Sequence, residues 1–309
     1  MCRIMSLTNV SKIKDLDATM LQLRDLVSKH NNDGFGYSVS YKSNLFTEKF
    51  IKPSDFVGLN KTLLHDKMAL PIFDNSNSLS HGEHGEKPLA IIAHGRTSTN
   101  LKGDVNYSHP FVKHDNAFIH NGVIDVPRKH DFDLITENDS EYLANVFWKH
   151  GHSGLNRVSG YFAFMNLKLN GKMEIAKDNI ASLFAAYIPA LDSYVFATLE
   201  NMIVEFCNNM QLQSTRISPV TSMQYFVVQG SKISASTSIT KSVKVKQLTA
   251  SEKKAFKDYS KPTKGFNEYR ATKVLGNESM PAKFSDPHYW ETDAELNDRM
   301  DFETKWEIK

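Results

Sequence analysis

The stretch Leu89-Ala90-Ile91-Ile92-Ala93 is a continuous apolar run that leads directly into His94-Gly95-Arg96. A run of this length without polar alternation is typical of a strand that is covered on both faces of its sheet. Such a strand needs a packed layer on each side. The run therefore predicts a central strand of a layered fold, with Arg96 held where that strand ends.

Outward from this run, predicted strands come in groups with helices between them. The predicted helices are about Asp15–His30, a helix that opens at Pro53, Asp139–His150 and Leu199–Cys207. The predicted strands are residues 1–6, Gly36–Tyr41, Asn44–Ile51, Phe111-Val112, Asn116–His120, Arg157–Leu167, Lys172–Ala176, Phe184–Ile188, Ser193–Thr198, Tyr225–Val228 and Lys232–Ser236. This order favours an α+β fold with sheets sandwiched by helices over the regular alternation of a Rossmann fold.

The composition indicates a folded protein without a disulfide framework. The 309 residues are 40% hydrophobic, which suits one large domain or a medium domain with an appendage. No apolar run reaches the roughly 18 residues of a membrane helix, and the start lacks the apolar core of a signal peptide. Two cysteines, Cys2 and Cys207, are too few for a disulfide scaffold, and we expect Cys207 to be a buried thiol. A cytoplasmic location is therefore expected.

The charge distribution changes after about Ser238. Residues 1–240 are neutral overall, whereas Lys241–Lys283 has 11 basic and 4 acidic side chains, and residues 284–309 have 3 and 8. We predict one domain over 1–240 and a C-terminal extension of unassigned role over 241–309. The extension either packs across the domain or forms a docking surface for a partner. Its basic part leaves nucleic-acid binding open, although the net charge of +2 argues against it.

Cys2 is the first candidate for chemistry. Removal of Met1, which is expected when a small residue follows it, would leave a thiol and an α-amine on the same residue. An α-amine with a pKa of about 8 can act as the base for that thiol. This is an N-terminal nucleophile arrangement, although a cysteine at position 2 is also commonly incidental.

Three further positions supply what acyl transfer from a free amino acid needs. Asn121-Gly122 offers an amide side chain and an accessible N–H for a developing oxyanion, or it is an ordinary hairpin turn. Arg96 can hold a carboxylate with two hydrogen bonds, or it closes a strand at the surface. Asp139 can hold an ammonium group, or it is only the N-cap of a helix.

Taken in order, these motifs resemble the glutaminase domain of the class II, or N-terminal nucleophile (Ntn), glutamine amidotransferases of the small stand-alone type. The resemblance covers roughly residues 2–205. The matching segments are Met1-Cys2-Arg3-Ile4, Asn32-Asp33-Gly34-Phe35-Gly36, Ala93-His94-Gly95-Arg96-Thr97-Ser98-Thr99, His109-Pro110-Phe111, His120-Asn121-Gly122, Asp139-Ser140-Glu141, Gly160-Tyr161-Phe162-Ala163 and Ala176-Lys177-Asp178. The resemblance implies a four-layer αββα sandwich, the Ntn-hydrolase fold.

The resemblance also implies a mechanism. Cys2 would attack the side-chain amide of glutamine, with its own α-amine as the base and later the acid. Asn121 and the amide of Gly122 would form the oxyanion hole. Ammonia would leave, and water would then cleave the γ-glutamyl thioester to glutamate.

Further residues of the matching motifs would bind the substrate or support the site. Arg96, helped by Thr99, would hold the α-carboxylate of glutamine, and Asp139 would hold its α-ammonium group. The possible supporting residues are His94, His109, Asp33 and Gly34.

Some features depart from the family pattern. Thr97 stands where many members carry a bulky aromatic residue, which leaves the shielding of the site open, and Lys177 stands where arginine is common. The C-terminal extension is too short for a synthase domain, so we expect a separate acceptor protein to receive the ammonia. No cofactor and no metal are expected, because His81-Gly82-Glu83-His84 lacks strong metal-ligand spacing.

The sequence thus predicts an amidotransferase subunit with glutamine as its substrate. Two alternatives stay open at this point. One is a hydrolase of another γ-glutamyl amide that uses the same nucleophile. The other is a non-catalytic binding or assembly protein that retains the fold and acts through residues 241–309.

Overall fold

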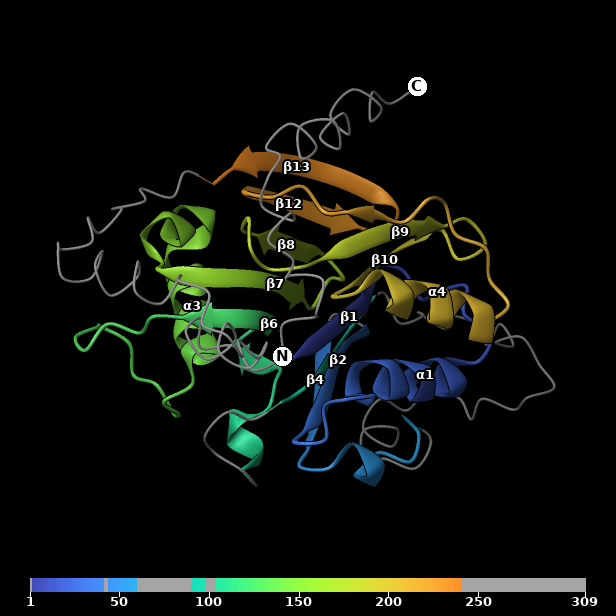
Figure 1. The fold of residues 1–309 in the computed structure, drawn as a ribbon, viewed down its shortest axis with the longest axis horizontal. Coiled ribbons are helices and arrows are strands. Elements are labelled where there is room, and N and C mark those ends of the chain that lie inside the picture. The colour runs from blue at the N-terminus through green and yellow to red at the C-terminus, as the bar shows by residue number, and fades with distance from the viewer. Residues whose placement is uncertain (1, 42–43, 60–89, 98–103, 240–309) are drawn as a thin grey trace, which may run out of the picture. The chain divides into compact units, whose positions relative to one another are not determined.

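The computed structural model describes residues 2–41, 44–59, 90–97 and 104–239. In this part of the chain the strands form two antiparallel sheets, which are shown in Figure 1. The seven-stranded sheet has the order β11-β9-β10-β1-β4-β2-β3. Its strands are β1 (Arg3–Leu7), β2 (Phe35–Tyr41), β3 (Asn44–Phe50), β4 (Ala90–Gly95), β9 (Phe184–Ile188), β10 (Ser193–Ala197) and β11 (Ser218–Pro219).

The six-stranded sheet faces the first and has the order β13-β12-β8-β7-β6-β5. Its strands are β5 (Phe111–Lys113), β6 (Asn116–Ile124), β7 (Gly160–Lys168), β8 (Met173–Lys177), β12 (Gln224–Gln229) and β13 (Lys232–Ser238). Three α-helices are described, namely α1 (Leu16–Ser28), α3 (Asp139–His150) and α4 (Glu200–Asn209). Short 3-10 helices are η1 (Pro53–Asp55), η3 (Val105–Tyr107) and η4 (Gly151–Arg157).

The helices cover the outer faces of the two sheets. Helices α1 and α4 share one hydrophobic cluster with the seven-stranded sheet, and α3 shares another with the six-stranded sheet. A third cluster fills the space between the sheets. Figure 1 shows the resulting order, with α1 and α4 on one side and α3 on the other. The predicted four-layer αββα sandwich is therefore confirmed.

The apolar run at β4 is buried on both faces, as its sequence predicts. Ala90 and Ile92 belong to the cluster between the sheets, whereas Ile91 and Ala93 belong to the cluster under α1 and α4. Full burial of one such isoleucine stabilises the fold by roughly 1.5–3 kcal/mol. Both layers therefore stabilise β4, and β4 fixes the position of the residues that follow it.

Two local predictions are wrong. Pro53–Asp55 forms a 3-10 turn where a helix is predicted to open, because Phe56 takes an extended conformation with φ −83° and ψ 108°; residues 60–89 lie outside the described chain. The strand predicted to stop before Asn121-Gly122 runs on to Ile124, and Asn121 pairs with Ala163 of β7. Asn121 and Gly122 therefore lie inside a strand, and the hairpin-turn reading of this dipeptide is wrong.

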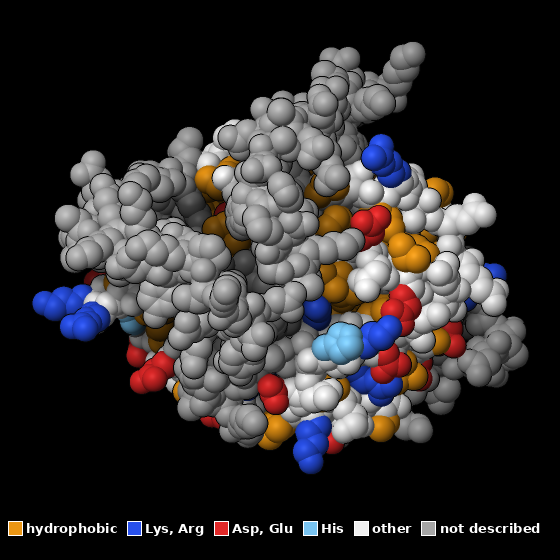
Figure 2. Space-filling model, viewed as in Figure 1, with side chains coloured by type: hydrophobic (Ala, Val, Ile, Leu, Met, Phe, Trp, Pro, Cys, Tyr) orange, Lys and Arg blue, Asp and Glu red, His pale blue; other side chains and the backbone are white. Residues whose placement is uncertain are grey.

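The described surface carries mixed charge. In Figure 2, basic and acidic side chains lie interspersed near α1 and α4. Lys29, just after α1, forms an ion pair with Glu205 of α4, with Nζ 2.9 Å from Oε2. In the described part of the chain, no helix is both long and apolar enough to span a membrane. The polar segment 74–87 and the extension over 241–309 lie outside the described residues.

Candidate active site

Cys2 lies immediately before β1 and faces the space between the sheets. Ile4 belongs to the cluster between the sheets, and side chains two residues apart on a strand share a face. The Cys2 thiol is partly buried and donates to the carbonyl oxygen of Thr97, with a Sγ···O distance of 3.8 Å. The start of β1 therefore places this sulfur beside the segment that follows β4.

Arg96 is buried, with 7% of its surface exposed, so the alternative of a surface arginine is wrong. Its backbone is fixed on both sides: its N–H donates to Gly34 at 2.8 Å, and its carbonyl accepts from Asp33 at 3.2 Å. Its guanidinium lies over the ring of Tyr107, 5.7 Å from the centroid. Gly34 has φ +157°, and a side chain there would meet Ser108 Oγ at 2.6 Å. Asp33 and Gly34 thus support Arg96 through the backbone.

Asn31 is a supporting residue for which the sequence predicts no role. Its buried side chain donates to the carbonyls of Val27 at 3.1 Å and Gly95 at 3.2 Å. Its Oδ1 accepts from the hydroxyl of Thr97 at 2.6 Å. Asn31 therefore ties the end of α1 to the end of β4. Asn31 is followed by Asn32-Asp33-Gly34, which is typical of an exposed turn, so the sequence does not predict that Asn31 is buried.

Asn121 presents a polar group between the sheets. It shares a strand face with Ala117 and Ile119, which belong to the cluster between the sheets. Its side chain is 1% exposed, and neither Oδ1 nor Nδ2 has a hydrogen-bond partner among the described residues. An unbonded buried amide costs free energy unless a ligand or water meets it. Asn121 therefore marks a place where a polar ligand fits.

Gly122 is a position where only glycine fits. Its φ is +155°, and an added Cβ would lie 2.1 Å from the carbonyl oxygen of Tyr161 and 2.6 Å from His120 Nε2. Such contacts are far inside van der Waals distance, and the first involves backbone that cannot move away cheaply. The β6 and β7 backbones therefore approach closely beside Asn121.

Asp139 is the first residue of α3, but the N-cap is Asn138, whose side chain accepts from the N–H of Ser140 at 2.9 Å. The N-cap reading of Asp139 is therefore wrong. Asp139 Oδ2 instead accepts from the N–H of Ile124 at 2.8 Å, at the end of β6. Its Oδ1 accepts from Ser140 Oγ at 3.3 Å. These bonds hold the Asp139 carboxylate two residues beyond Gly122 along β6.

Three buried histidines lie behind the site. The rings of His94 and His109 stack with centroids 3.9 Å apart, and His94 Nε2 lies 3.2 Å from the carbonyl oxygen of His120. His120 Nδ1 lies 2.8 Å from Ser140 Oγ, which reaches Asp139. Burial lowers the pKa of His94 to about 3 and the pKa of His109 well below its usual value. Burial also lowers the pKa of His120, although the charge of Asp139 opposes this.

The charges near Cys2 set the state of its thiol. Burial raises the pKa of the Cys2 thiol, the Asp139 carboxylate raises it further, and the Arg96 guanidinium lowers it. The thiol is therefore protonated at neutral pH, and a base must accept its proton before it can attack. Both Arg96 and Asp139 act on this sulfur, so Cys2, Arg96 and Asp139 lie in one electrostatic neighbourhood.

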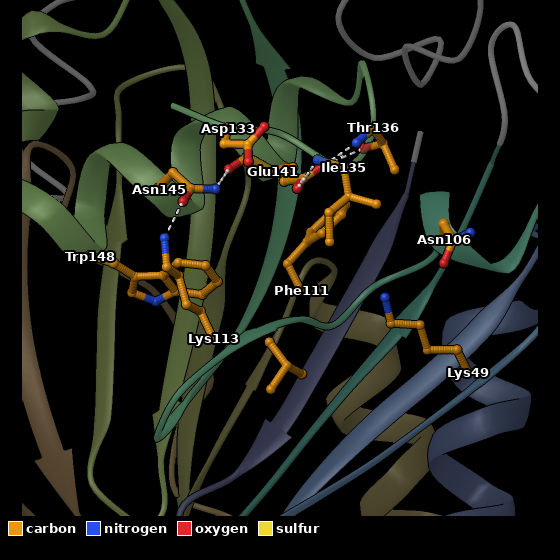
Figure 3. A pocket seen from close by; sticks show the side chains of 11 residues that line it. Lys49, Asn106, Phe111, Lys113, Asp133, Ile135, Thr136, Glu141, Asn145 and Trp148 are labelled. Carbon is orange, nitrogen blue, oxygen red and sulfur yellow. Dashed lines mark hydrogen bonds between the residues drawn. The ribbon is translucent and has the colours of Figure 1, made fainter. Parts of the chain in front are cut away.

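A separate cavity of about 320 Å³ lies beside α3 (Figure 3). Its lining comes from β3, η3, β5, the loop before α3 and α3 itself, and Figure 3 labels most of these side chains. Lys113 Nζ donates to Asn145 Oδ1 at 3.0 Å, and Glu141 accepts from the N–H of Thr136 at 2.7 Å. These polar groups are bonded to one another, and the lining lacks Cys2 and Asn121. The cavity is therefore distinct from the candidate site.

Some predicted site residues lie outside the described chain. Thr99 and the segment His81-Gly82-Glu83-His84 are in this group. Within the described residues, no group of three or more His, Cys, Asp or Glu side chains could hold a metal ion. Cys207 lies in α4 with 6% of its surface exposed, so its prediction as a buried thiol is confirmed.

No protein-family model matches this sequence, and no curated protein matches it. Among solved structures, the chain resembles glutamine phosphoribosylpyrophosphate amidotransferase from B. subtilis, in complex with ADP and GMP, with a TM-score of 0.51 and 15% identity. The similarity covers 77% of this chain and 49% of that one, so the chain spans about half the length of this neighbour. At this identity, the likeness shows a shared fold.

Two further structures are similar at lower scores. One, described as the allosteric regulatory enzyme of purine biosynthesis, has a TM-score of 0.49 and 15% identity over 77% of this chain and 49% of that chain. The other is a glutamine aminotransferase class-II domain protein from Silicibacter pomeroyi, with a TM-score of 0.41 and 11% identity over 77% of this chain and 99% of that chain.

Proposed function

We propose that this chain hydrolyses the side-chain amide of glutamine and supplies the ammonia to a separate acceptor enzyme, as a glutamine amidotransferase subunit. One observation carries the proposal. Cys2 lies two residues before Ile4 on β1, Asn121 lies two residues after Ile119 on β6, and these two isoleucines belong to the cluster between the sheets; Arg96 and Asp139 are close enough to shift the pKa of the Cys2 thiol. The fold shared with a glutamine amidotransferase supports this reading.

Cys2 is the proposed nucleophile. Because its thiol pKa is raised by burial, the thiol needs a base, and the lowered pKa values of His94, His109 and His120 make these histidines weak proton acceptors. The proposal assigns this task to the α-amine of Cys2 itself, which becomes available when Met1 is removed. With a pKa of about 8, that amine is partly unprotonated at neutral pH and can accept the thiol proton.

Asn121 and Gly122 are the proposed oxyanion hole. Attack on the amide carbon places negative charge on its oxygen, and Asn121 Nδ2 is a buried donor without a bond in the described chain. A donor held in place before the reaction is worth more than one that must reorient. The fit of Gly122 between Tyr161 and His120 keeps this stretch of β6 rigid.

Arg96 and Asp139 are the proposed binding groups for the amino-acid end of glutamine. A guanidinium binds a carboxylate through two parallel hydrogen bonds, and the buried position of Arg96 fixes that fork. The Asp139 carboxylate accepts bonds from Ile124 and Ser140 and keeps lone pairs for an ammonium group. In this proposal Thr99 assists Arg96, as the family resemblance implies.

The reaction then proceeds in two balanced steps. The sulfur forms a bond to the amide carbon, the carbon–nitrogen bond breaks, and the departing nitrogen takes the proton held by the α-ammonium to leave as ammonia. Water next attacks the γ-glutamyl thioester with the α-amine as base. The sulfur–carbon bond breaks, the departing sulfur takes the proton back from the α-ammonium, and glutamate leaves the regenerated thiol.

The test is intact mass spectrometry of the full chain after incubation with 6-diazo-5-oxo-norleucine, together with glutaminase assays. We expect one adduct on wild-type protein that has lost Met1, and the same adduct on Cys207→Ala, which removes the other cysteine. Cys2→Ala should show neither the adduct nor the release of glutamate. Wild-type turnover in Cys2→Ala, or a wild-type protein that neither reacts nor hydrolyses glutamine, would contradict the proposal.

A further inference from the structure

Tyr161 lies beside the proposed oxyanion hole, on the neighbouring strand. In the register of β6 and β7, Tyr161 pairs with Val123 and Ala163 pairs with Asn121. Side chains at positions 161 and 163 therefore share the sheet face of Asn121, which looks into the space between the sheets. The carbonyl oxygen of Tyr161 also closes the space around Gly122, 2.1 Å from where a Cβ would stand.

The Tyr161 side chain packs on apolar groups and has two carboxylates within electrostatic reach. It is partly buried and packs against the cluster between the sheets. Burial raises its pKa, and the negative charges of Asp139 and Asp178 raise it further. The phenol is therefore neutral at physiological pH and lies within electrostatic reach of both the reacting sulfur and the Asp139 carboxylate.

We propose that Tyr161 selects the substrate: its ring flanks the amide carbon attacked by Cys2 and limits the size of the amine that can leave. This inference rests on the proposed function. It goes beyond that function because it assigns the site to the unsubstituted γ-amide rather than to larger γ-glutamyl conjugates.

The geometry around the amide carbon gives the reason. In the proposed mechanism the sulfur of Cys2 approaches one face, the oxygen points at Asn121 and Gly122, and the carbon chain leads to Arg96 and Asp139. The leaving nitrogen is the third group bonded to the amide carbon, and it points away from both the oxygen and the carbon chain. Phe162, the β7 partner of Gly122, belongs to the cluster under α3, whereas its neighbour Tyr161 packs on the cluster between the sheets. In the proposal, a substituent on that nitrogen therefore meets the Tyr161 ring.

The experiment compares kcat/KM for glutamine, γ-glutamylmethylamide and γ-glutamyl-p-nitroanilide in the full chain. Tyr161→Ala should raise kcat/KM for the two substituted amides relative to glutamine by about tenfold or more, the scale at which pockets discriminate small groups. Tyr161→Phe keeps the ring and should leave the ratio within about twofold. Tyr161→Leu keeps apolar packing while shortening the side chain, and it serves if Tyr161→Ala does not fold.

Tyr194→Ala is the matched control. Tyr194 belongs to the same cluster between the sheets but lies on β10 next to Val195, which pairs with Leu7 at the end of β1 away from Cys2. It should lower the melting temperature and leave the substrate ratio unchanged. An unchanged ratio in folded Tyr161→Ala and Tyr161→Leu, or an equal change in Tyr194→Ala, would overturn the inference while the proposed function stands. A wild-type chain with no Cys2-dependent turnover of any of the three amides would overturn both.

Discussion

Asn121 and Asn31 are two buried asparagines that lie close to the candidate site but differ in how their hydrogen bonds are met. Asn31 uses its amide to join α1, β4 and Thr97. Asn121 has no bond at either amide atom within the described chain. Its burial is therefore a cost to the fold, and the proposed chemistry gives a reason for keeping it.

This contrast predicts that one alanine substitution lowers kcat and the other lowers the free energy of unfolding. Asn121→Ala should reduce kcat for glutamine by about 10²- to 10³-fold, the usual loss for an oxyanion donor, and should not lower the free energy of unfolding. Asn31→Ala should lower that free energy by about 2 kcal/mol, because it removes bonds worth roughly 0.5–1.5 kcal/mol each. Kinetics and urea unfolding measure the two effects. Destabilisation by Asn121→Ala with normal kcat would show that its role is structural.

Among helices and strands, the apolar pattern of a segment predicts its bounds where burial of that segment's own face determines them. Helix α3 runs from Asp139 to His150 as predicted, because Leu143, Val146 and Phe147 repeat at helical spacing and bury one face. Strand β9 also has its predicted bounds, Phe184–Ile188. Each of these segments buries a continuous pattern of apolar side chains, so its own sequence is enough to predict its bounds.

Elements whose bounds depend on distant partners were not predicted. β6 continues past Asn121-Gly122 because β7 pairs with it as far as Gly160, which local turn propensity does not show. The short strand β11 was missed because it exists only through its pairing with β9. The burial of Asn31 and the place of Tyr161 depend in the same way on the tertiary fold. The motif residues could be named from sequence, but their contacts could not.

The stacked histidines, His94 on β4 and His109 just before β5, predict how the free energy of unfolding depends on pH. The folded pKa of His94 is about 3 and that of His109 is also lowered, whereas an unfolded histidine has a pKa of about 6.5. Below pH 6.5 the unfolded chain therefore binds more protons than the folded one. The free energy of unfolding should fall as pH falls from about 6.5 toward 3, by up to about 1.4 kcal/mol per pH unit for each histidine.

Urea unfolding at pH 7 and pH 5 measures this effect. His94→Gln, which keeps a donor for the carbonyl of His120, should show a smaller loss of stability between the two pH values than wild type. His30→Gln is the matched control for the same substitution at an exposed position. Equal pH dependence in wild type and His94→Gln would show that His94 is not a source of the acid sensitivity.

For the whole molecule, the domain boundary at residue 240 stays a prediction. The site is built from residues that precede β13, and the charge distribution changes just after that strand. A chain that ends at residue 240 should therefore keep the cooperative unfolding and the Cys2-dependent glutaminase activity of the full chain. Loss of either would show that residues 241–309 belong to the folded unit. Salt-dependent binding of nucleic acid by the full chain alone would assign a role to the basic segment.

The central place of β1 has a consequence for how the protein folds. β1 pairs on one side with β10, and the bond between Ile4 and Thr198 joins residues 194 positions apart. Contacts of such long range slow folding, because the intervening chain must be ordered before they form. During synthesis β1 is complete long before β10, so the edge of β1 that pairs with β10 stays open until residues 193–197 have been made. A nascent chain or fragment that ends before β10 therefore exposes an apolar strand edge that can pair with other chains, and a chaperone that shields this edge should raise the yield of folded protein.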